Sequence, residues 1–201
     1  MPRLTLLFAV MLAALLCKAQ QSSAYGIRPD GREVVSLAPE GTKAVALFFV
    51  ASDCPISNRT FPEMKRLREQ FAPRGVRFWF VYPNQGERPE QVIQHQAAYD
   101  NGGEVLLDTT GRLAQITNAH VTPEVSVLIP DAAAGWRPVY TGRIDDRYIR
   151  LGLERPKATA HFAERTLTAV LAGAPVEPAT GTPVGCSIIH PTATPAGSHA
   201  R

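Results

Sequence analysis

An unbroken apolar run from Ala44 to Val50 is the feature that most restricts what this chain can fold into. A strand with apolar side chains at every position leaves no face for solvent, so it is typical of the interior of a largely parallel sheet that is covered on both sides. The run Val76–Tyr82, VRFWFVY, has the same character. Because helices are the usual cover for both faces of such a sheet, the two runs predict a layered α/β fold.

Segments with helical periodicity alternate with these strands. After the first run, TFPE at Thr60 has the spacing of a capping box, and we expect a helix to begin there. Apolar residues then recur on one helical face at Met64, Leu67 and Phe71. Further helices are predicted at Pro89–Tyr99, within Asp108–Thr117 and after Thr159, and further strands or hairpins at Tyr25–Ser36, Glu104–Leu107, Glu124–Ile129 and Trp136–Ile144. The order β-α-β-α-β-α-β-β-α predicts a mixed central sheet flanked by helices.

The length of 201 residues suits one domain with a single core. We place this domain at residues 25–175, after a leader at residues 1–24. Beyond Pro175 the sequence is dominated by Pro, Gly, Ala, Thr and Ser. Residues 176–201 are therefore expected to form an irregular tail, which carries Cys186.

The leader has the pattern of a secretory signal peptide. Arg3 precedes the apolar segment Leu4–Leu16, and small residues suit cleavage after Ala19 or Ala24. The apolar segment is shorter than the roughly 20 residues of a membrane-spanning helix. The sequence thus predicts a periplasmic or secreted protein, with a retained membrane anchor as the alternative.

Cleavage changes both the charge and the set of cysteines. The formal net charge of +3 falls when Arg3 and Lys18 are lost, and no basic block remains, so nucleic acid is not an expected partner. Cys17 is also lost, which leaves Cys54 and Cys186 as the only thiols in a compartment where disulfides persist. A lipoprotein signal that retains Cys17 is disfavoured because the residue before it is not small.

Cys54 stands where the first apolar strand gives way to a helix. Such a position lies among unpaired backbone N–H groups and near the positive end of the helix dipole. Both favour the thiolate over the thiol and predict a nucleophilic cysteine. The polar neighbours of Cys54, and the turn that Pro55 imposes, favour this interpretation over an inert buried cysteine. The carboxylate of Asp53 is expected to oppose it by raising the pKa of the thiol.

Three parts of the sequence together resemble the thioredoxin-like redoxins: the run Val45–Leu67, the later segment HVTPEVSVLI, and the hairpin and helix that follow it. This group contains exported bacterial thiol-disulfide oxidoreductases and the alkyl hydroperoxide reductase/thiol-specific antioxidant proteins. The resemblance covers roughly Tyr25 to Gly173. It implies a thioredoxin-like three-layer fold and a thiol-dependent oxidoreductase without a cofactor or a resident metal. The implied partners are a thiol or disulfide substrate, either a protein or a small molecule, and an external thiol reductant.

The attacking cysteine of that family can be placed on this chain. Exported relatives carry a Cys-X-X-Cys motif followed by a proline five residues beyond the second cysteine. Cys54, Pro55, Ile56 and Ser57 fit this frame, with Pro62 at the expected spacing. The resemblance therefore makes Cys54 the attacking cysteine. Ser57 replaces the second cysteine and is expected to hydrogen-bond the thiolate.

The substrate edge of the family falls on a second segment. Thr122-Pro123 lies where these proteins place a cis-proline that faces the cysteine. The implied role of this dipeptide is to shape a backbone edge that pairs with an extended disulfide substrate. Thr122, Pro123 and Pro55 are accordingly the expected substrate-binding residues.

Two departures from the family pattern affect the reaction. Peroxiredoxins carry a threonine three residues before the attacking cysteine, and here that residue is Ala51, so peroxidase activity is the alternative and not the expectation. Ser57 cannot resolve a mixed disulfide, which makes Cys186 the candidate resolving cysteine if the tail reaches Cys54. A static disulfide to Cys54, a bond to another chain and an idle tail thiol are competing interpretations of Cys186.

A binding module without catalysis is a function of a different class. In that case the edge Val121–Glu124 would bind a partner, or Cys54, His120 and Cys186 would form a soft-metal site of the kind that copper-delivering thioredoxin-like chaperones use. Those chaperones keep both cysteines in the local motif, and this chain does not.

The loop Gly142–Tyr148 is unusually charged. Asp145 and Asp146 are adjacent, with Arg143 and Arg147 on either side. We expect an ion-pair network that holds the loop and not a cation site. No glycine-rich phosphate loop, dinucleotide-binding motif or HExxH metal motif is present in the sequence.

Overall fold

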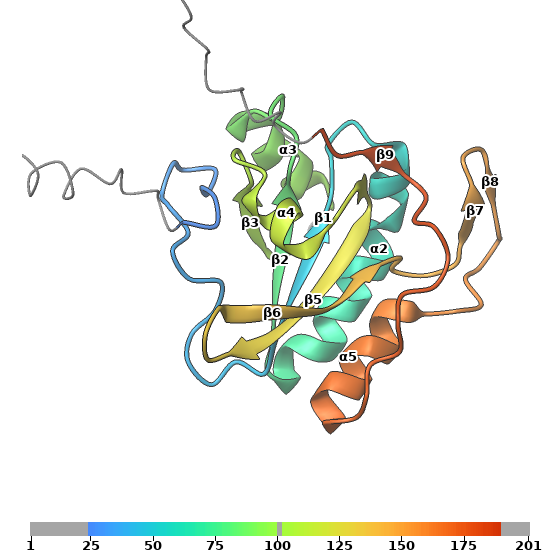
Figure 1. Cartoon of the computed structure of the whole chain (residues 1–201). Helices are drawn as coiled ribbons and strands as arrows, with labels where there is room; N and C mark the ends of the chain where they lie inside the picture. Colours follow the sequence, from blue (N-terminus) through green and yellow to red (C-terminus); the bar gives the residue numbers. More distant parts are fainter. Residues whose placement is uncertain (1–23, 100–101, 190–201) are drawn as a thin grey trace, which may run out of the picture.

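Helices and strands alternate along the chain, as the sequence predicts (Figure 1). The computed structural model describes residues 24–99 and 102–189, so all of the proposed signal peptide except Ala24 lies outside the described residues. The elements, in chain order, are β1 (Ala44–Phe49), α2 (Pro55–Phe71), the 3-10 helix η1 (Ala72–Arg74), β2 (Val76–Tyr82), α3 (Pro89–Tyr99), β3 (Glu104–Leu107), α4 (Arg112–Thr117), β4 (Val121–Thr122), β5 (Glu124–Asp131), β6 (Gly135–Gly142), β7 (Tyr148–Arg150), β8 (Leu153–Glu154), α5 (Phe162–Ala172) and β9 (Cys186–Ser187). Among the described residues, no helix has both the length and the apolar character needed to cross a bilayer.

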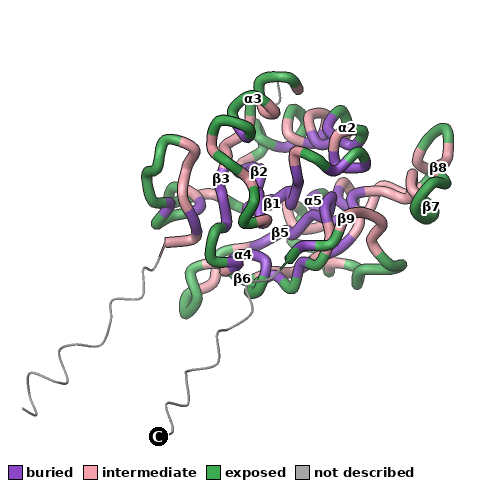
Figure 2. The backbone as a smooth tube through the Cα atoms, turned by 90° about the horizontal axis from the view of Figure 1, so that it is seen from above, coloured by how far each residue is buried: buried purple, intermediate pink, exposed green. Residues whose placement is uncertain are grey.

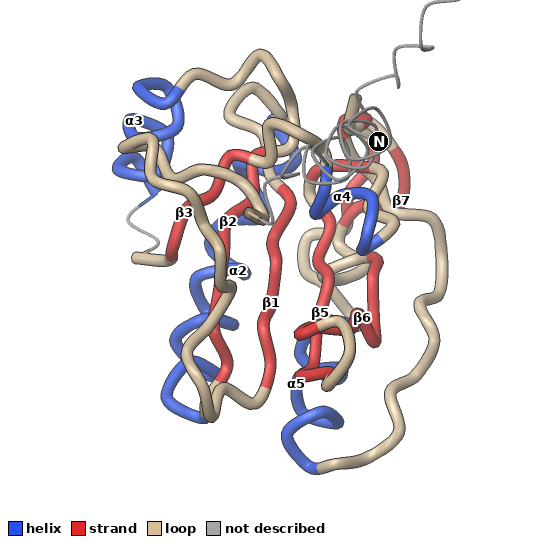
Figure 3. The backbone as a smooth tube through the Cα atoms, turned by 60° about the vertical axis from the view of Figure 1, so that its left-hand side comes forward, coloured by secondary structure: helices blue, strands red, loops and turns tan. Residues whose placement is uncertain are grey.

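A five-stranded mixed sheet with the order β3-β2-β1-β5-β6 forms the centre of the fold. Figure 3 shows these strands side by side in that order. β1 pairs in parallel with β2, from Ala44 opposite Val76, and antiparallel with β5, where Phe49 lies opposite Glu124. The predicted mixed sheet is therefore confirmed, with the fully apolar strand β1 in the middle.

The two faces of β1 belong to two separate apolar layers. Ala44, Ala46 and Phe48 face a cluster that contains the buried sides of α2, α3 and α5. Val45 and Leu47 face a second cluster, which includes residues of α4 and of the segment before β1. Most of β1, β2 and β5 is buried in this three-layer arrangement (Figure 2). The helices and strands thus have the α/β layering expected from the apolar runs.

The first helix begins earlier than its sequence pattern predicts. α2 starts at Pro55 and not at Thr60, and it continues through Pro62. Proline is well suited to the first position of a helix, because its φ is already helical and its missing N–H would be unpaired there in any case. The hydroxyl of Thr60 does not cap the helix and instead donates to the carbonyl of Ile56 at 2.7 Å. The residues Pro55, Ile56 and Ser57 therefore lie in the first helical turn.

The last helix also starts differently from its prediction. α5 begins at Phe162 with His161 as its N-cap residue, whereas Thr159 was the predicted cap. The N–H and hydroxyl of Thr159 donate to the carboxylate of Asp146, each at 2.6 Å, which uses the polar groups that would have capped the helix. The end of the helix agrees with its prediction, because Gly173 is the C-cap residue with a left-handed φ of 66°.

The charged loop after β6 is held by polar contacts, but not by those predicted. Asp146 pairs with Arg155 at 3.6 Å, and the carboxylate of Asp145 accepts the backbone N–H of Arg147 at 2.9 Å. The side chain of Arg147 pairs with the glutamate of β8 at 3.1 Å, and that of Arg143 donates to backbone carbonyls. The predicted pairing of the two aspartates with their flanking arginines is therefore wrong. The partners come from the short hairpin β7–β8, which the sequence did not predict, and from the residues that flank it.

The segment Tyr25–Ser36 forms a turn that is closed like a hairpin. The N–H of Tyr25 donates to the carbonyl of Val34 at 2.8 Å, and Ile27 forms isolated bridges with Glu33 and with Leu107 of β3. The predicted turn is present, but the flanking residues form no continuous strand.

Phe61 joins α2 to the sheet, which makes it a test of this packing. Its ring stacks on those of Phe80, with centroids 5.4 Å apart, and Tyr99, at 4.5 Å. Phe61→Ala should lower the free energy of unfolding by about 3–5 kcal/mol, because it leaves a cavity between layers that relax only partly. Urea unfolding measures this change. Ile93→Ala, on the exposed side of α3, is the control and should change it by less than about 0.5 kcal/mol. A loss below about 1 kcal/mol for Phe61→Ala would contradict the packing described.

Candidate active site

Cys54 is the N-cap residue of α2 and directly follows the turn at the end of β1. Its backbone is extended, with φ −85° and ψ 109°. The N–H of Cys54 donates to the carbonyl of Ala51 at 3.2 Å, and its own carbonyl accepts the N–H of Asn58 at 3.0 Å. The side chain has no exposed surface. The predicted junction of strand and helix is thus present, but its thiol is covered.

The loop between β4 and β5 covers Cys54 from one side. The peptide bond Thr122–Pro123 is cis, as the family resemblance implies, and both residues are buried. When protonated, the thiol of Cys54 donates to the carbonyl oxygen of Thr122 at 3.1 Å. Of the three residues expected to bind substrate, Thr122 therefore contacts the sulfur, and Pro123 directly follows it in the same buried loop.

The tail covers Cys54 from the other side. β9 pairs antiparallel with β4, so that Cys186 lies opposite Thr122 and Ser187 opposite Val121. The N–H of Ile188 extends this pairing by donating to the carbonyl before β4 at 2.8 Å. The sulfur atoms of Cys54 and Cys186 are 2.7 Å apart, and both cysteines are free thiols. The predicted approach of the tail to Cys54 is present in the structure.

Opposing effects act on the ionisation of Cys54. Burial is the largest of them and would raise its pKa. The hydrogen bond from Cys186, the N–H and hydroxyl of Ser57 and the hydroxyl of Thr122 all lower it, and the net result is a lowered pKa. Once ionised, Cys54 no longer donates to the Thr122 carbonyl, but it still accepts the hydrogen bond that the thiol of Cys186 donates. The structure thus favours a thiolate at Cys54, stabilised by donors from three segments.

The pKa of Cys186 is shifted in the opposite direction. Burial raises it most, and the hydrogen bond to Cys54, the charge on Cys54 and the charge on Asp53 raise it further. The effect that the sequence predicts for Asp53 on Cys54 is therefore found on Cys186. Of the two thiols, Cys54 ionises first and Cys186 keeps its proton.

Ser57 and Pro55 differ in how closely they approach the sulfur. Ser57 is fully buried in the first turn of α2, and its N–H and hydroxyl help to lower the pKa of Cys54. Among the described residues its hydroxyl has no hydrogen-bond partner, which leaves it available to a thiolate. Pro55 is exposed on the outer side of the same turn. Pro55 is therefore the one predicted substrate-binding residue that does not join the buried group.

Glu87 holds the turn that carries Cys54, a role that no sequence pattern indicates. One oxygen of its carboxylate accepts the backbone N–H of Ser52 at 2.8 Å, and the other accepts the hydroxyl of Ser52 at 2.6 Å. Glu87 lies in the loop between β2 and α3. Because no local pattern links this loop to Ser52, only the three-dimensional structure reveals the contact.

A part-buried chain of side-chain hydrogen bonds also supports this turn. Asn58 donates from Nδ2 to the carbonyl of Ser52 at 3.2 Å. Its Oδ1 lies 2.7 Å from Nε2 of His95, whose Nδ1 lies 2.6 Å from the hydroxyl of Tyr82. Burial lowers the pKa of His95, which fits a neutral ring that donates from Nε2 and accepts at Nδ1. The turn is thus connected to β2 and α3 by side chains that do not touch the sulfur.

Glu124 fixes the other wall of the site. Its carboxylate accepts the N–H groups of His120 and Val121, at 2.8 and 3.3 Å, and so closes the loop around the cis-proline. Burial raises the pKa of Glu124, and these two hydrogen bonds offset the effect only in part. Its position directly after Pro123 in the sequence could have suggested such a role, because a carboxylate there is within reach of the loop's amides.

The space beside the cis-proline is small. A cavity of about 20 Å³ is lined by residues that include Ile56, Pro123, Tyr148 and Val184. Such a volume holds about one water molecule. Because Cys54 has no exposed surface, access to its sulfur requires a change in the surrounding segments.

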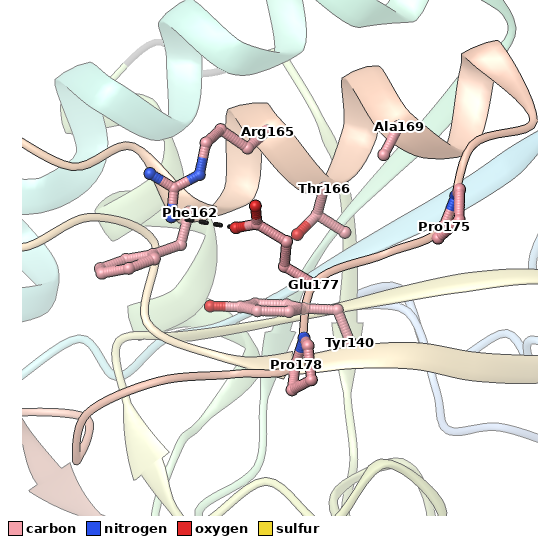
Figure 4. Close-up of a pocket in the computed structure, with 8 residues that line it drawn as sticks. All are labelled: Tyr140, Phe162, Arg165, Thr166, Ala169, Pro175, Glu177 and Pro178. Carbon is pink, nitrogen blue, oxygen red and sulfur yellow. Dashed lines mark ion pairs between the residues drawn. The ribbon is translucent and has the colours of Figure 1, made fainter.

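A larger cavity lies elsewhere, between α5 and the chain that follows it (Figure 4). It has a volume of about 110 Å³, and Arg165 and Glu177 form an ion pair across it at 3.6 Å. None of the predicted site residues lines it.

The soft-metal site considered from the sequence is not assembled in the structure. Among the described residues, the one group of three metal-binding side chains with ligand atoms within 4.8 Å of one another is Glu63, His161 and Glu164. Arg66 forms ion pairs with both of these glutamates, at 2.7 and 2.6 Å, and so already balances their charge. Cys54, Cys186 and His120 do not form such a group.

The pKa of Cys54 can be measured from the absorbance of its thiolate near 240 nm. The titration curve of Cys54→Ala is subtracted from that of the wild type. The difference curve should have a midpoint below the ordinary thiol pKa of about 8.5. Because the pKa is lowered, the thiolate is present above this midpoint and is lost as the pH falls through it. Cys186→Ala removes a hydrogen-bond donor and should raise the midpoint.

Ser187→Ala is the matched control for this titration, because Ser187 is exposed on the same strand and should leave the midpoint unchanged. All variants carry Cys17→Ala, so that only the two cysteines of interest contribute. A wild-type midpoint at or above 8.5 would contradict the stabilised thiolate.

Comparisons with known proteins agree with this architecture. Residues 18–133 match the AhpC/TSA family. A hypothetical protein from Sinorhizobium meliloti 1021 has a similar structure, with a TM-score of 0.67 and 22% identity over 83% of this chain and 90% of that chain. An uncharacterized conserved protein from Geobacillus kaustophilus has a TM-score of 0.63 and 25% identity, over 84% and 88% of the two chains. A thioredoxin-like protein from Aeropyrum pernix has a TM-score of 0.51 and 17% identity, over 82% and 96%.

No protein with a curated description matches the chain significantly. The structural neighbours establish a thioredoxin-like fold, which confirms the fold class expected from the sequence. The sequence match covers more than half of the chain and includes both Cys54 and the cis-proline loop. On this evidence the chain is a member of the AhpC/TSA family of thioredoxin-like redoxins.

Proposed function

We propose that this protein is an exported thiol-disulfide oxidoreductase in which Cys54 attacks the substrate and Cys186 resolves the intermediate. One observation carries the proposal. Two cysteines that are 132 positions apart have sulfur atoms 2.7 Å apart, and their pKa values are shifted in opposite directions. Export is inferred from the leader pattern of residues 1–24.

The first step is attack by the thiolate of Cys54 on a substrate disulfide. The new bond joins the sulfur of Cys54 to one substrate sulfur, the substrate disulfide breaks, and the other substrate sulfur leaves as a thiolate. The lowered pKa of Cys54 supplies the nucleophile near neutral pH. Ser57 and Thr122 hold the negative charge before the attack, and Thr122 with Pro123 forms the edge on which the substrate segment lies.

The first step then activates the second thiol. The hydrogen bond to Cys54 and the negative charge on Cys54 both raise the pKa of Cys186. Both effects end when Cys54 becomes part of a mixed disulfide, because its sulfur is then neutral. Cys186 consequently loses its proton more easily after the attack than before it. Its thiolate attacks the sulfur of Cys54 and releases the substrate as a thiol, which leaves the Cys54–Cys186 disulfide.

An external dithiol restores the starting state by supplying two electrons. Cys186 is partly exposed, whereas Cys54 is buried, so Cys186 is the accessible target. Attack on the sulfur of Cys186 releases Cys54 as the leaving thiolate and joins the reductant to Cys186 in a mixed disulfide. The second thiol of the reductant then attacks the reductant sulfur of this bond, which releases Cys186 and forms the disulfide of the reductant. A thiol of lower pKa leaves faster, and Cys54 is the one with the lowered pKa. The lowered pKa of Cys54 therefore favours both its attack on the substrate and its release during the reduction.

The family match favours a second candidate reaction at the same cysteine, the reduction of a peroxide. The thiolate of Cys54 would attack the peroxide bond, release an alcohol and become a sulfenic acid. Condensation with the thiol of Cys186 would then form the disulfide and water. Ala51 argues against this reaction, because peroxiredoxins carry a hydroxyl group at that position.

Mass spectrometry of the non-reduced protein tests the proposed cycle. After treatment with oxidised glutathione, the wild type should contain the Cys54–Cys186 disulfide. Cys186→Ser should stop at a glutathione adduct on Cys54, because nothing then resolves the mixed disulfide. Cys54→Ser should form no such disulfide, and two free thiols in the treated wild type would overturn the proposal.

Peroxide consumption separates the two candidate reactions. The wild type and Cys54→Ser are compared with hydrogen peroxide and a thiol donor, beside the rate of exchange with oxidised glutathione. The thiol-disulfide proposal requires that exchange depends on Cys54 and is faster than peroxide consumption. If peroxide consumption depends on Cys54 and is the faster of the two reactions, the peroxidase hypothesis replaces the thiol-disulfide proposal.

A further inference from the structure

The tail lies on the edge that the proposed function gives to the substrate. β9 pairs with β4 through Cys186 and Thr122, and Figure 1 shows it beside the start of α2. Cys54 has no exposed surface. A substrate segment can therefore reach Cys54 only by taking the place of the tail. The contacts of residues 184–188 then indicate which side chains of a substrate segment this edge accepts.

The residue before the reacting cysteine must be glycine on this edge. A Cβ atom at Gly185 would lie 2.1 Å from the carbonyl oxygen of Thr122 and 2.7 Å from its carbonyl carbon. Both are backbone atoms of a loop that Glu124 holds in place, so neither can move aside easily. Any L-residue with a side chain would have to lift the segment away from Thr122.

The residue two positions after the cysteine is selected by an apolar surface. Ile188 is only 6% exposed and belongs to the cluster on the far face of the sheet, with Leu47 and Leu113. Its N–H donates to the carbonyl of His120 at 2.8 Å, which fixes the register of the strand. Ser187, between them, is exposed and contributes a backbone pair only. The edge therefore distinguishes the second position after the cysteine and not the first.

The residue two positions before the cysteine meets a smaller apolar surface. Val184 packs against the cluster of Ala51, Cys54 and Ile56, together with the ring of Tyr148. It also lines the small cavity beside Pro123. An aliphatic side chain fits here, whereas a charged one would lose its hydration next to the thiolate.

We propose that the site selects disulfide substrates by a short sequence pattern, aliphatic-Gly-Cys-any-aliphatic, of which the protein's own tail is an example. This inference rests on the proposed function, because it assumes that Cys54 attacks a disulfide. In the selected reaction the thiolate of Cys54 bonds to the cysteine sulfur of the substrate segment. The disulfide of that cysteine breaks, and its former partner leaves as a thiolate, so no electrons are gained or lost overall.

Synthetic peptides test the pattern. The reference peptide has the sequence of residues 183–189, Pro-Val-Gly-Cys-Ser-Ile-Ile, with its cysteine joined to 5-thio-2-nitrobenzoate in a mixed disulfide. Two further peptides replace the glycine by alanine or the first isoleucine by aspartate. A third replaces the serine by alanine, at the position that the edge does not distinguish. Glutathione in the same mixed disulfide is the substrate without the pattern.

The protein used is the full chain with Cys17→Ala and Cys186→Ser, so that only Cys54 reacts. It is prepared with and without Gly185→Ala, which should lift the tail from the edge. Gly86→Ala is the matched control, because a Cβ atom there meets no atom within 4 Å. Absorbance at 412 nm follows the release of thionitrobenzoate.

The reference peptide and the serine-replaced peptide should react at similar rates. Both should react at least tenfold faster than the alanine-for-glycine peptide, the aspartate peptide and the glutathione disulfide. Gly185→Ala should speed up the reference peptide, and Gly86→Ala should not. Should Gly185→Ala fold poorly, the same ranking of peptides is required of the protein with its native tail, only at lower rates.

Equal rates for all peptides and for the glutathione disulfide would overturn the selectivity and leave the proposed function standing. No release from any of these substrates, including the glutathione disulfide, would overturn the proposed function and the selectivity with it. The two failures are therefore distinguishable in one experiment.

Discussion

The burial of β1 on both faces is the constraint from which the rest of the site follows. β1 is hydrogen-bonded to β2 on one side and to β5 on the other, with an apolar layer above and below it. Its chain can leave the sheet only at the end of the strand, where the turn leads directly into α2. The register that sets Phe49 opposite Glu124 also brings Pro123, the residue before Glu124, next to that turn. The thiol and the cis-proline loop thus meet because the last residue of β1 pairs with the first residue of β5.

The tail has two opposite effects on Cys54. By covering the sulfur it contributes to the burial that would raise the pKa, and through Cys186 it supplies the hydrogen bond that most lowers it. The tail therefore both covers Cys54 and helps to lower its pKa. Without the tail, Cys54 would be more accessible but would lack the hydrogen bond from Cys186. In the proposed cycle this arrangement keeps the resting thiolate away from adventitious oxidants while the second thiol is held within bonding distance.

The apolar runs were sufficient to predict the layers, because a strand such as Ala44–Phe49 has only one place in an α/β fold. Helix starts were less predictable. Thr60 and Thr159 have capping chemistry, but the hydroxyl of Thr60 donates to a carbonyl one turn earlier in the same helix, and that of Thr159 donates to Asp146. The approach of Cys186 to Cys54 could be suspected only from cysteine counting, and its strand pairing with Thr122 could not be predicted, since no local pattern marks a strand of two residues. Glu87 had no signal at all, because its contact with Ser52 depends on where two loops meet in space.

The irregular stretch between Gly173 and β9 has a consequence for kinetics. It tethers one sulfur to the molecule that carries the other, so the encounter of Cys54 and Cys186 is a first-order event with a local concentration set by the length of the tether. Diluting the protein does not slow such an encounter. In the proposed cycle, such a pair reacts within a single molecule, so the rate of its internal step does not depend on the concentration of the protein.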